Sequence, residues 1–171
     1  IGAPENDGNG NSSGHVRVYD RDTDNTTIEP IGWTQVGSDI NGEAASDKSG
    51  YSVAMSSDGT IIAIGSGGGG AGSNYGVAVY KLDDSSWDKM GSNIITYTYQ
   101  SFGQSLAMSN DGTRIIIGNS EGFMNNDWDN RGLVEVYDWD GSSSWDKVGG
   151  TIYGEASGDE FGYSVAMSSD G

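Results

Sequence analysis

A ten-residue segment recurs three times along the chain and limits what the chain can fold into. Residues 50–59 read GYSVAMSSDG; the segment returns as GQSLAMSNDG at 103–112 and unchanged at 162–171. The first residues of successive copies are 53 and 59 positions apart (103 − 50 and 162 − 103). A repeat of this length is typical of stacked supersecondary units, each too small to bury its own apolar face.

The composition favours strands joined by tight turns. Glycine accounts for 29 of the 171 residues and proline for only 2, while 34% of the residues are hydrophobic. No window shows the i, i+3, i+4, i+7 spacing of apolar residues that marks an amphipathic helix. Short apolar runs separated by glycine-rich turns are typical of all-β chains. We therefore predict an all-β protein.

Each complete copy predicts four strands. Asp58-Gly59 lies between two apolar runs, which is a strong signal for a β-hairpin, because Asp58 can hydrogen-bond the local backbone and Gly59 can adopt a positive φ. The expected strands of this copy span 52–55, 60–64, 76–80 and 87–94. Those of the next copy span 105–108, 114–117, 132–137 and 145–152. Those of the N-terminal copy include 14–19 and 33–40.

The N-terminal copy lacks its first strand, whereas the C-terminus carries an extra one. Residues 1–2 read Ile-Gly, the dipeptide that ends the second strand at 64–65 and 117–118. The missing first strand and hairpin are present at 162–171 instead. Since the sequence opens on Ile1, we expect either a removed leader or an excerpt of a longer chain. We expect a single repeat domain over 1–171, with repeats at 1–49, 50–101 and 102–161.

Four-stranded antiparallel units of about fifty residues are typical of β-propeller blades. We therefore predict three four-stranded, blade-like repeats that are circularly offset. Three blades are too few for an ordinary ring, so we expect a neighbouring molecule to complete the first blade by strand addition. We expect this strand addition together with a slice of a continuous array. A six-bladed ring of two chains, and completion of the first blade by 162–171 of the same chain, are the alternatives. The expected assembly strand comprises Tyr163, Ser164, Val165, Ala166 and Met167, pairing with Ile1, Gly2 and Ala3.

Two aromatic positions recur in every copy. They are Tyr19, Tyr80 and Tyr137 in the third strands, and Trp33, Trp87 and Trp145 in the fourth strands. An aromatic residue that occupies the same place in each repeat is expected to pack between blades rather than to bind a ligand.

Several short motifs resemble a known family. Phe-Gly occurs at 102–103 and 161–162, Ile-Gly-Ala-Pro at 1–4, and Val-x-Val-Tyr in the third strands. Together they resemble FG-GAP-type repeats, which build the propeller of integrin α-subunits and occur in arrays in microbial and algal surface proteins. The resemblance implies a propeller fold and an extracellular or cell-surface setting.

Two loops offer oxygen atoms at alternating residues, the arrangement that Ca²⁺ prefers. The first loop supplies Asp7, Asn9, Asn11 and Ser13. The second loop supplies Asp20, Asp22 and Asp24. The first is also the loop in which integrin-like repeats hold calcium, so the resemblance implies calcium as a cofactor there. For both loops, a solvated turn rich in Asp and Asn is the alternative.

Two N-glycosylation sequons occur in predicted loops. They begin at Asn11 and Asn25 and read Asn-Ser-Ser and Asn-Thr-Thr. They predict a glycoprotein if the chain passes through a secretory pathway. A glycan on Asn11 would compete with its role as a metal ligand.

Charge and residue content exclude several classes of function. The formal net charge is −17, from 25 acidic and 8 basic side chains, and this field repels nucleic acids and anionic membranes. No apolar run is long enough to cross a bilayer. There is no cysteine and only one histidine, His15, so the residues needed for Ser-His and Cys-His nucleophile pairs are almost absent. We predict that the protein is not an enzyme.

These observations lead to one functional prediction and one alternative. We predict an extracellular structural protein that forms a filament or surface coat as a head-to-tail homopolymer, by β-strand complementation. The alternative is a calcium-supported propeller module that binds carbohydrate or protein ligands. A fibre would image as a polymer without ligand, whereas a binding module would be a discrete particle.

Overall fold

The computed structural model describes residues 1–67, 76–95, 102–122 and 130–171, and within these it is all β, with three antiparallel sheets and no helix. The first sheet contains β1 (Gly2–Ala3), β2 (His15–Arg21) and β3 (Trp33–Asn41). The second contains β4 (Ser49–Met55), β5 (Ile61–Ser66), β6 (Gly76–Asp83), β7 (Ser86–Lys89) and β8 (Ile94–Ile95). The third contains β9 (Ser105–Met108), β10 (Arg114–Asn119), β11 (Leu133–Trp139) and β12 (Trp145–Tyr153).

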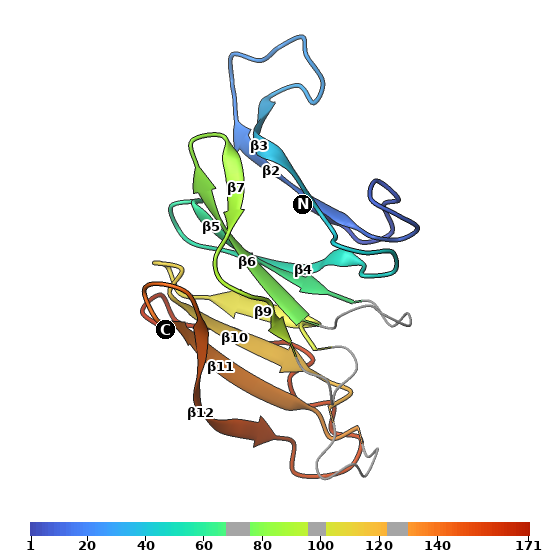
Figure 1. Cartoon of the computed structure of the whole chain (residues 1–171), viewed down its shortest axis with the longest axis vertical. Helices are drawn as coiled ribbons and strands as arrows, with labels where there is room; N and C mark the ends of the chain where they lie inside the picture. Colours follow the sequence, from blue (N-terminus) through green and yellow to red (C-terminus); the bar gives the residue numbers. More distant parts are fainter. Residues whose placement is uncertain (68–75, 96–101, 123–129) are drawn as a thin grey trace.

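The sheets are stacked face to face in chain order along the long axis of the molecule (Figure 1). The N-terminus lies at the first sheet and the C-terminus beside the third. Within the described parts of the chain, no helix is long and apolar enough to span a membrane. The expected repeat boundary at residue 101 lies outside the described residues.

The predicted Asp-Gly hairpins are formed. Asp58 Oδ1 accepts hydrogen bonds from the Thr60 backbone N–H (3.0 Å) and the Ser56 hydroxyl (2.7 Å), and Gly59 has a φ of 73°. The equivalent hairpin of the third sheet has Asp111 in the same role and a φ of 72° at Gly112. In both hairpins the aspartate carboxylate accepts hydrogen bonds within its own turn, and the glycine after it adopts a positive φ. These two requirements explain why the Asp-Gly pair recurs.

The sheets contain three, five and four strands, rather than four each as the repeat pattern suggested. The five arise because the expected strand 87–94 is divided: β7 and β8 both pair with β6. Gly91, between them, has a φ of 72°. In the other two sheets, Gly37 (φ 72°) and Gly149 (φ 68°) lie at the equivalent place, where the register shifts at a β-bulge. The positive φ of this glycine bends the fourth strand in every repeat.

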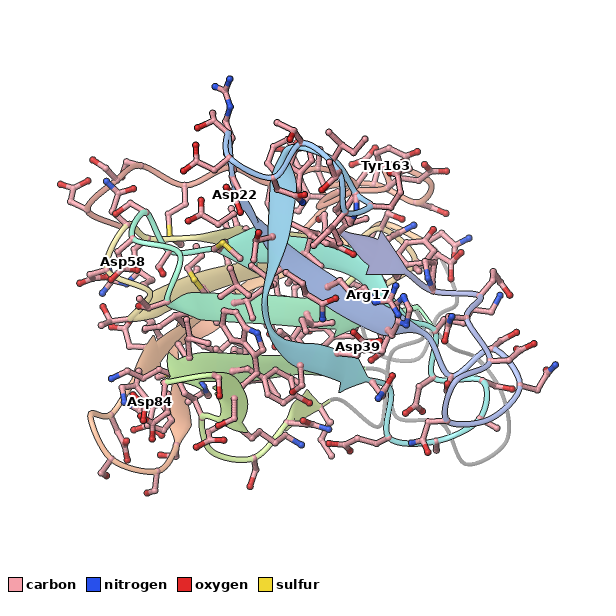
Figure 2. The ribbon with its side chains drawn as sticks, turned by 90° about the horizontal axis from the view of Figure 1, so that it is seen from above. Arg17, Asp22, Asp39, Asp58, Asp84 and Tyr163 are labelled. Atoms are coloured by element: carbon pink, nitrogen blue, oxygen red, sulfur yellow. The ribbon has the colours of Figure 1, made fainter. Side chains whose placement is uncertain are left out.

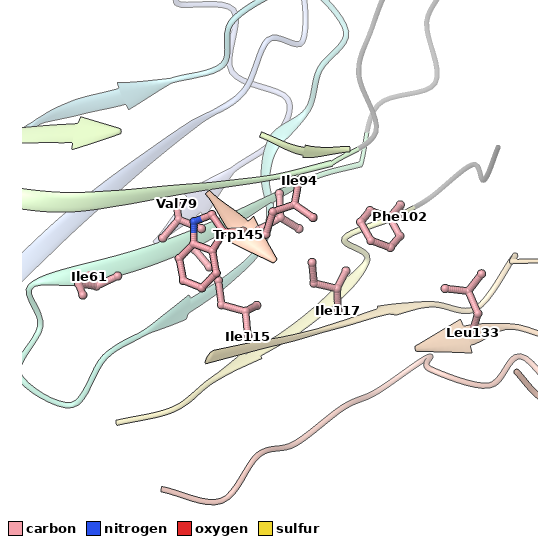
Figure 3. Packing of buried hydrophobic residues seen from close by; sticks show 10 residues of the cluster. Ile61, Val79, Ile94, Phe102, Ile115, Ile117, Leu133 and Trp145 are labelled. Carbon is pink, nitrogen blue, oxygen red and sulfur yellow. The ribbon is translucent and has the colours of Figure 1, made fainter. Parts of the chain in front are cut away.

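Two apolar clusters fill the spaces between sheets. The cluster between the first and second sheets includes Val16, Ile40, Ile64 and Trp87. The cluster between the second and third sheets, drawn in Figure 3, includes Val79, Ile94, Phe102, Ile117 and Trp145. We call each packed interface between two successive sheets a joint. Each joint combines valines and isoleucine of one sheet with isoleucines and a tryptophan of the next.

Glycine sets how closely the sheets approach at their inner edge. A Cβ atom added at Gly65 would overlap the carbonyl oxygen of Gly103, and one added at Gly118 would overlap the carbonyl oxygen of Gly162. The same overlap relates Gly2 to the carbonyl oxygen of Gly50. Backbone packs directly on backbone at this position, so no side chain fits there.

We predict that Gly65→Ala lowers the free energy of unfolding by about 3 kcal/mol, because the methyl group forces two sheets apart. Gly150→Ala is the matched control, since a Cβ at Gly150 meets nothing within 4 Å and its φ is not positive. We expect that variant to stay within about 0.5 kcal/mol of the parent. Chemical denaturation followed by tryptophan fluorescence measures both, and equal stability of the two variants would contradict this account of sheet spacing.

Candidate assembly site

The stack of sheets has two open ends, and apolar side chains are exposed at both. We call the end of the stack that carries the first sheet the leading face. It includes Ile1 and Trp33, and also Val53 and Met55 of β4 in the second sheet, whose cross-strand partners Ile64 and Ile62 face the first sheet. We call the outer side of the third sheet the trailing face, with Val148, Ile152 and Phe161. All seven side chains are exposed. Contiguous exposed apolar groups on a protein surface mark an interaction site.

The trailing face exposes residues whose equivalents are buried in the internal joints. Ile152 is 53% exposed, whereas Ile40 and Ile94 at the same strand position are each 6% exposed. Phe161 is 42% exposed, whereas Phe102 is fully buried. The third sheet therefore presents the surface that the first two sheets cover with a following sheet. Sequence reasoning did not identify these residues as a docking surface, although isoleucine recurs at this strand position in all three repeats and phenylalanine at its position in two.

The leading face is hollowed where the first sheet is incomplete. In the second sheet, Val79 and Tyr80 pair with Ala63 and Ile62 of β5. In the first sheet, β1 pairs with Val16 and His15, and Val18 and Tyr19 line a cavity of about 610 Å³. Its other lining residues are Ile1, Pro30, Trp33 and Met55.

The first sheet also has an unpaired inner edge. Within the described residues, β1 pairs with β2 alone, whereas its counterpart β5 pairs with both β4 and β6. Backbone N–H and C=O groups along such an edge are free to pair with an added strand. The expected partner, residues 163–167, does not pair with β1 of its own chain. Figure 1 shows the two ends of the chain at opposite sheets.

The segment 162–171 is already docked on the third sheet, although it pairs with no neighbouring strand there. The Ser105 hydroxyl donates to the carbonyl of Gly162 (2.6 Å), just as the Ser52 hydroxyl donates to the carbonyl of Gly103 (2.5 Å). At the far end, the Arg114 guanidinium donates to the carbonyl of Gly171 (2.8 Å). The segment thus sits on the third sheet as β9 sits on the second.

The two faces of this segment differ. Val165 and Met167 are half-buried, whereas Ser164 and Ala166 are exposed. Because successive side chains of a strand alternate between faces, the first pair lies toward the third sheet and the second pair away from it. The face that is left open therefore carries small side chains, as close packing of another sheet requires. Tyr163, beside them, lies at the edge of the molecule in Figure 2.

Polar clusters hold the bulges of the first and third sheets. In the first, Arg17 donates two hydrogen bonds to Asp39 (2.8 and 2.9 Å), and this lowers the pKa of Asp39 to about 2 (Figure 2). In the third, burial acts to raise the pKa of Glu135, but hydrogen bonds from Lys147 (2.6 Å), Thr151 (2.6 Å) and Tyr137 (2.7 Å) outweigh it and lower the pKa. The carboxylates stay ionised at neutral pH and fix the fourth strands at both ends of the stack.

Some side-chain atoms of the two candidate calcium loops already have hydrogen-bond partners. Asp7 Oδ1 accepts from the Ser12 N–H (2.7 Å), and the Asn9 amide donates to the carbonyl of Gly42 (2.7 Å). Asp22 accepts from the Thr34 hydroxyl (2.7 Å), which lowers the pKa of Asp22. No group of three or more His, Cys, Asp or Glu side chains within the described residues is arranged to hold a metal ion. Calcium binding by Asp7, Asn9, Asn11, Ser13, Asp20, Asp22 and Asp24 stays a prediction.

The predicted sequon at Asn25 lies in an ordered loop that leads into β3. Asn25 Nδ2 donates to the carbonyls of Ile28 (2.9 Å), Pro30 (3.2 Å) and Trp33 (3.0 Å). A glycan attached to this nitrogen would leave it one hydrogen for three acceptors. Glycosylation at Asn25 and at Asn11 stays a prediction.

Comparison with known proteins assigns no family to this arrangement. A scan against models of protein families finds no match, and a search of curated proteins finds no relative of significant similarity.

We predict that Ser105→Ala loosens the docked segment, because it removes the hydroxyl that holds the carbonyl of Gly162. Hydrogen exchange followed by mass spectrometry should show several-fold faster exchange in 162–167, since one neutral hydrogen bond contributes about 1 kcal/mol. Ser52→Ala removes the equivalent bond of the internal joint and should leave exchange in 162–167 unchanged. Equal exchange of this segment in Ser105→Ala and the parent would show that the hydroxyl does not hold it.

Proposed function

We propose that the protein is a structural module with β-propeller-type repeats that assembles head to tail with copies of itself. The docked segment 162–171 of one copy becomes the missing inner strand of the first sheet of the next copy. One observation carries the proposal: this segment is identical in sequence to 50–59, which forms the inner strand of the second sheet. It already sits on the third sheet as β9 sits on the second.

The internal sheets supply the register of the proposed strand pairing. In the second sheet, Ser52 pairs with Gly65 and Val53 with Ile64. The third sheet repeats this with Ser105 opposite Gly118. Since Ile1-Gly2 is the counterpart of Ile64-Gly65, we expect Ser164 opposite Gly2 and Val165 opposite Ile1 of the next copy. A shift by one residue would turn the larger side chains toward the tightly packed face.

The glycine contact at the first joint lacks the serine that accompanies it elsewhere. An added Cβ would meet Ser52 Oγ at Gly65 and Ser105 Oγ at Gly118, besides a glycine carbonyl in each case. At Gly2 its three nearest atoms all belong to the backbone of Gly50. Ser164 of a neighbouring copy would fill this place and donate its hydroxyl to the carbonyl of Gly50.

Strand addition would also cover the apolar side chains of β4. Val53 and Met55 are 41% and 39% exposed, whereas Leu106 and Met108, their counterparts in β9, pack against the core of the second joint. Complete burial of a side chain of this size contributes about 1.5–3 kcal/mol. Apolar burial and main-chain hydrogen bonds together favour association, and the partner that supplies both in matching register is a second copy of this chain.

A filament or surface coat in an extracellular setting is the form of assembly that we propose. The joint is heterologous, since the trailing face of one copy meets the leading face of the next, and such joints produce open polymers unless the rotation closes a ring. The strongly acidic composition, with a net charge of −17, keeps such an assembly from binding nucleic acids and anionic membranes.

We predict that the parent chain associates in a concentration-dependent manner and that Ala166→Arg abolishes this association. Ala166 is exposed in the single chain, so the variant should fold, but its long side chain would prevent the next sheet from closing on the strand. Ala44→Arg is the matched control, because Ala44 is exposed on the loop between the first and second sheets. Sedimentation velocity compares the three proteins. The buffer should contain roughly 0.15 M salt, at which repulsion between the acidic chains is screened beyond about 8 Å.

The expected result is larger species for the parent and Ala44→Arg, and a monomer for Ala166→Arg. A parent chain that stays monomeric at every concentration would overturn the proposed function. So would equal association of parent and Ala166→Arg, because the exposed face of the segment would then lie outside the joint.

A further inference from the structure

At the outer rim of both internal joints, a tryptophan of one sheet donates a hydrogen bond to the residue that precedes a glycine in the sheet before it. The Trp87 indole N–H of the second sheet donates to the carbonyl of Val36 in the first (3.0 Å). The Trp145 indole N–H of the third sheet donates to the carbonyl of Met90 in the second (3.1 Å). In each case the accepting residue is followed directly by a glycine with positive φ. The contact joins the fourth strands of successive sheets.

The glycine is needed because the neighbouring sheet occupies the space of its side chain. A Cβ added at Gly37 would lie 2.7 Å from Trp87 Nε1 and 3.2 Å from the carbonyl oxygen of Ser85. One added at Gly91 would lie 2.6 Å from the carbonyl oxygen of Ser143. The space beside each glycine is thus occupied by the next sheet, either by its tryptophan or by the turn before that tryptophan.

The two ends of the stack carry the separate halves of this contact. Trp33, the counterpart of Trp87 and Trp145, is 48% exposed, whereas those two are 8% and 9% exposed. Gly149, the counterpart of Gly37 and Gly91, has a φ of 68°, and an added Cβ there would meet nothing within 4 Å. Within the described residues, the Trp33 indole N–H at the leading face has no acceptor like those of Trp87 and Trp145. The space beside Gly149 at the trailing face is open.

We infer that Trp33 of one copy docks over Gly149 of the preceding copy and donates its indole N–H to the carbonyl of Val148. The partner at this surface is a second copy of the chain. The inference rests on the proposed head-to-tail assembly and adds an outer contact to the inner strand. It makes Trp33 the residue that selects the partner, because only a fourth strand with a bare glycine can receive the ring.

The loop before Trp33 prepares it for this role. Asn25 Nδ2 donates to the carbonyl of Trp33 (3.0 Å), and the Trp33 N–H donates to the carbonyl of Pro30 (3.1 Å). The backbone that carries the ring is therefore fixed before docking, which reduces the entropy lost on association. Ile31, which is 52% exposed, stands two residues before Trp33, the sequence position that Ser85 and Ser143 hold before the tryptophans of the internal joints.

Gly149→Asn tests the contact with little harm to the single chain. Asparagine tolerates a positive φ better than other residues, and the place of its side chain is empty until a second copy docks. Gly141→Asn is the matched control, with a φ of 87° and nothing within 4 Å of an added Cβ. Sedimentation equilibrium should show at least about tenfold weaker association for Gly149→Asn and for Trp33→Ala, as for a buried aromatic anchor.

Mixing the two defective proteins tests the pairing itself. Trp33→Ala has a damaged leading face and Gly149→Asn a damaged trailing face, so each alone should remain monomeric. Their mixture should form heterodimers through the one intact pair, Trp33 of one protein on Gly149 of the other. No heterodimer would overturn the inference.

The outcomes separate this inference from the proposed function. A monomeric parent chain contradicts head-to-tail assembly as a whole. A parent chain that associates, loses association in Ala166→Arg and keeps it in Gly149→Asn contradicts the tryptophan contact alone. Equal losses in Gly149→Asn and Gly141→Asn also overturn the contact, because the substitution would then act on the fold.

Discussion

The direct packing of glycine backbone on glycine backbone between successive sheets is the constraint on which the rest of the structure depends. At Gly65 and Gly118 there is no room for a Cβ atom, so neighbouring sheets meet at the distance that the backbone allows. At that distance the Ser52 and Ser105 hydroxyls reach carbonyls of the next sheet. The indole groups at the outer rim reach carbonyls in the same way. The second joint is therefore held by a side-chain hydrogen bond at each edge and by an apolar cluster between them, whereas the first joint has the indole hydrogen bond at its outer edge and its own apolar cluster.

A sheet in this stack buries its apolar side chains only against a neighbouring sheet. The first and third sheets therefore each leave one apolar face uncovered. The internal joints show what each end needs: an inner strand with small side chains, isoleucines against valines, and a tryptophan over a glycine. The leading and trailing faces hold these elements separately, with Trp33 and Ile1 on one and Gly149 and Ile152 on the other. In the proposed head-to-tail assembly, the complementarity of the two faces is a consequence of the repeat.

Much of the fold follows from local patterns in the sequence. Asp58-Gly59 and Asp111-Gly112 predict hairpins, and the structure contains them because carboxylate and glycine act within four residues. The division of the fourth strand at Gly91 was not predicted, since it depends on the turn that packs against this glycine from the next sheet. The all-β class is confirmed, whereas the β-propeller-type nature of the repeats is part of the proposal.

The candidate site was only partly predictable for the same reason. The strand 163–167 follows from its identity with part of 50–59. The outer contact does not, because Trp33 and Gly149 are 116 residues apart (149 − 33) and become a pair only when two internal examples show the geometry. The recurrent spacing of tryptophan and glycine, as WTQVG, WDKMG and WDKVG, was the available signal.

Cryo-electron microscopy of the concentrated 171-residue chain tests the central claim most directly. The account predicts a polymer in which residues 162–167 of each copy form a strand with β1 of the next, with Ser164 opposite Gly2. Single particles of one chain, or density in which this segment pairs with β1 of its own copy, would contradict it.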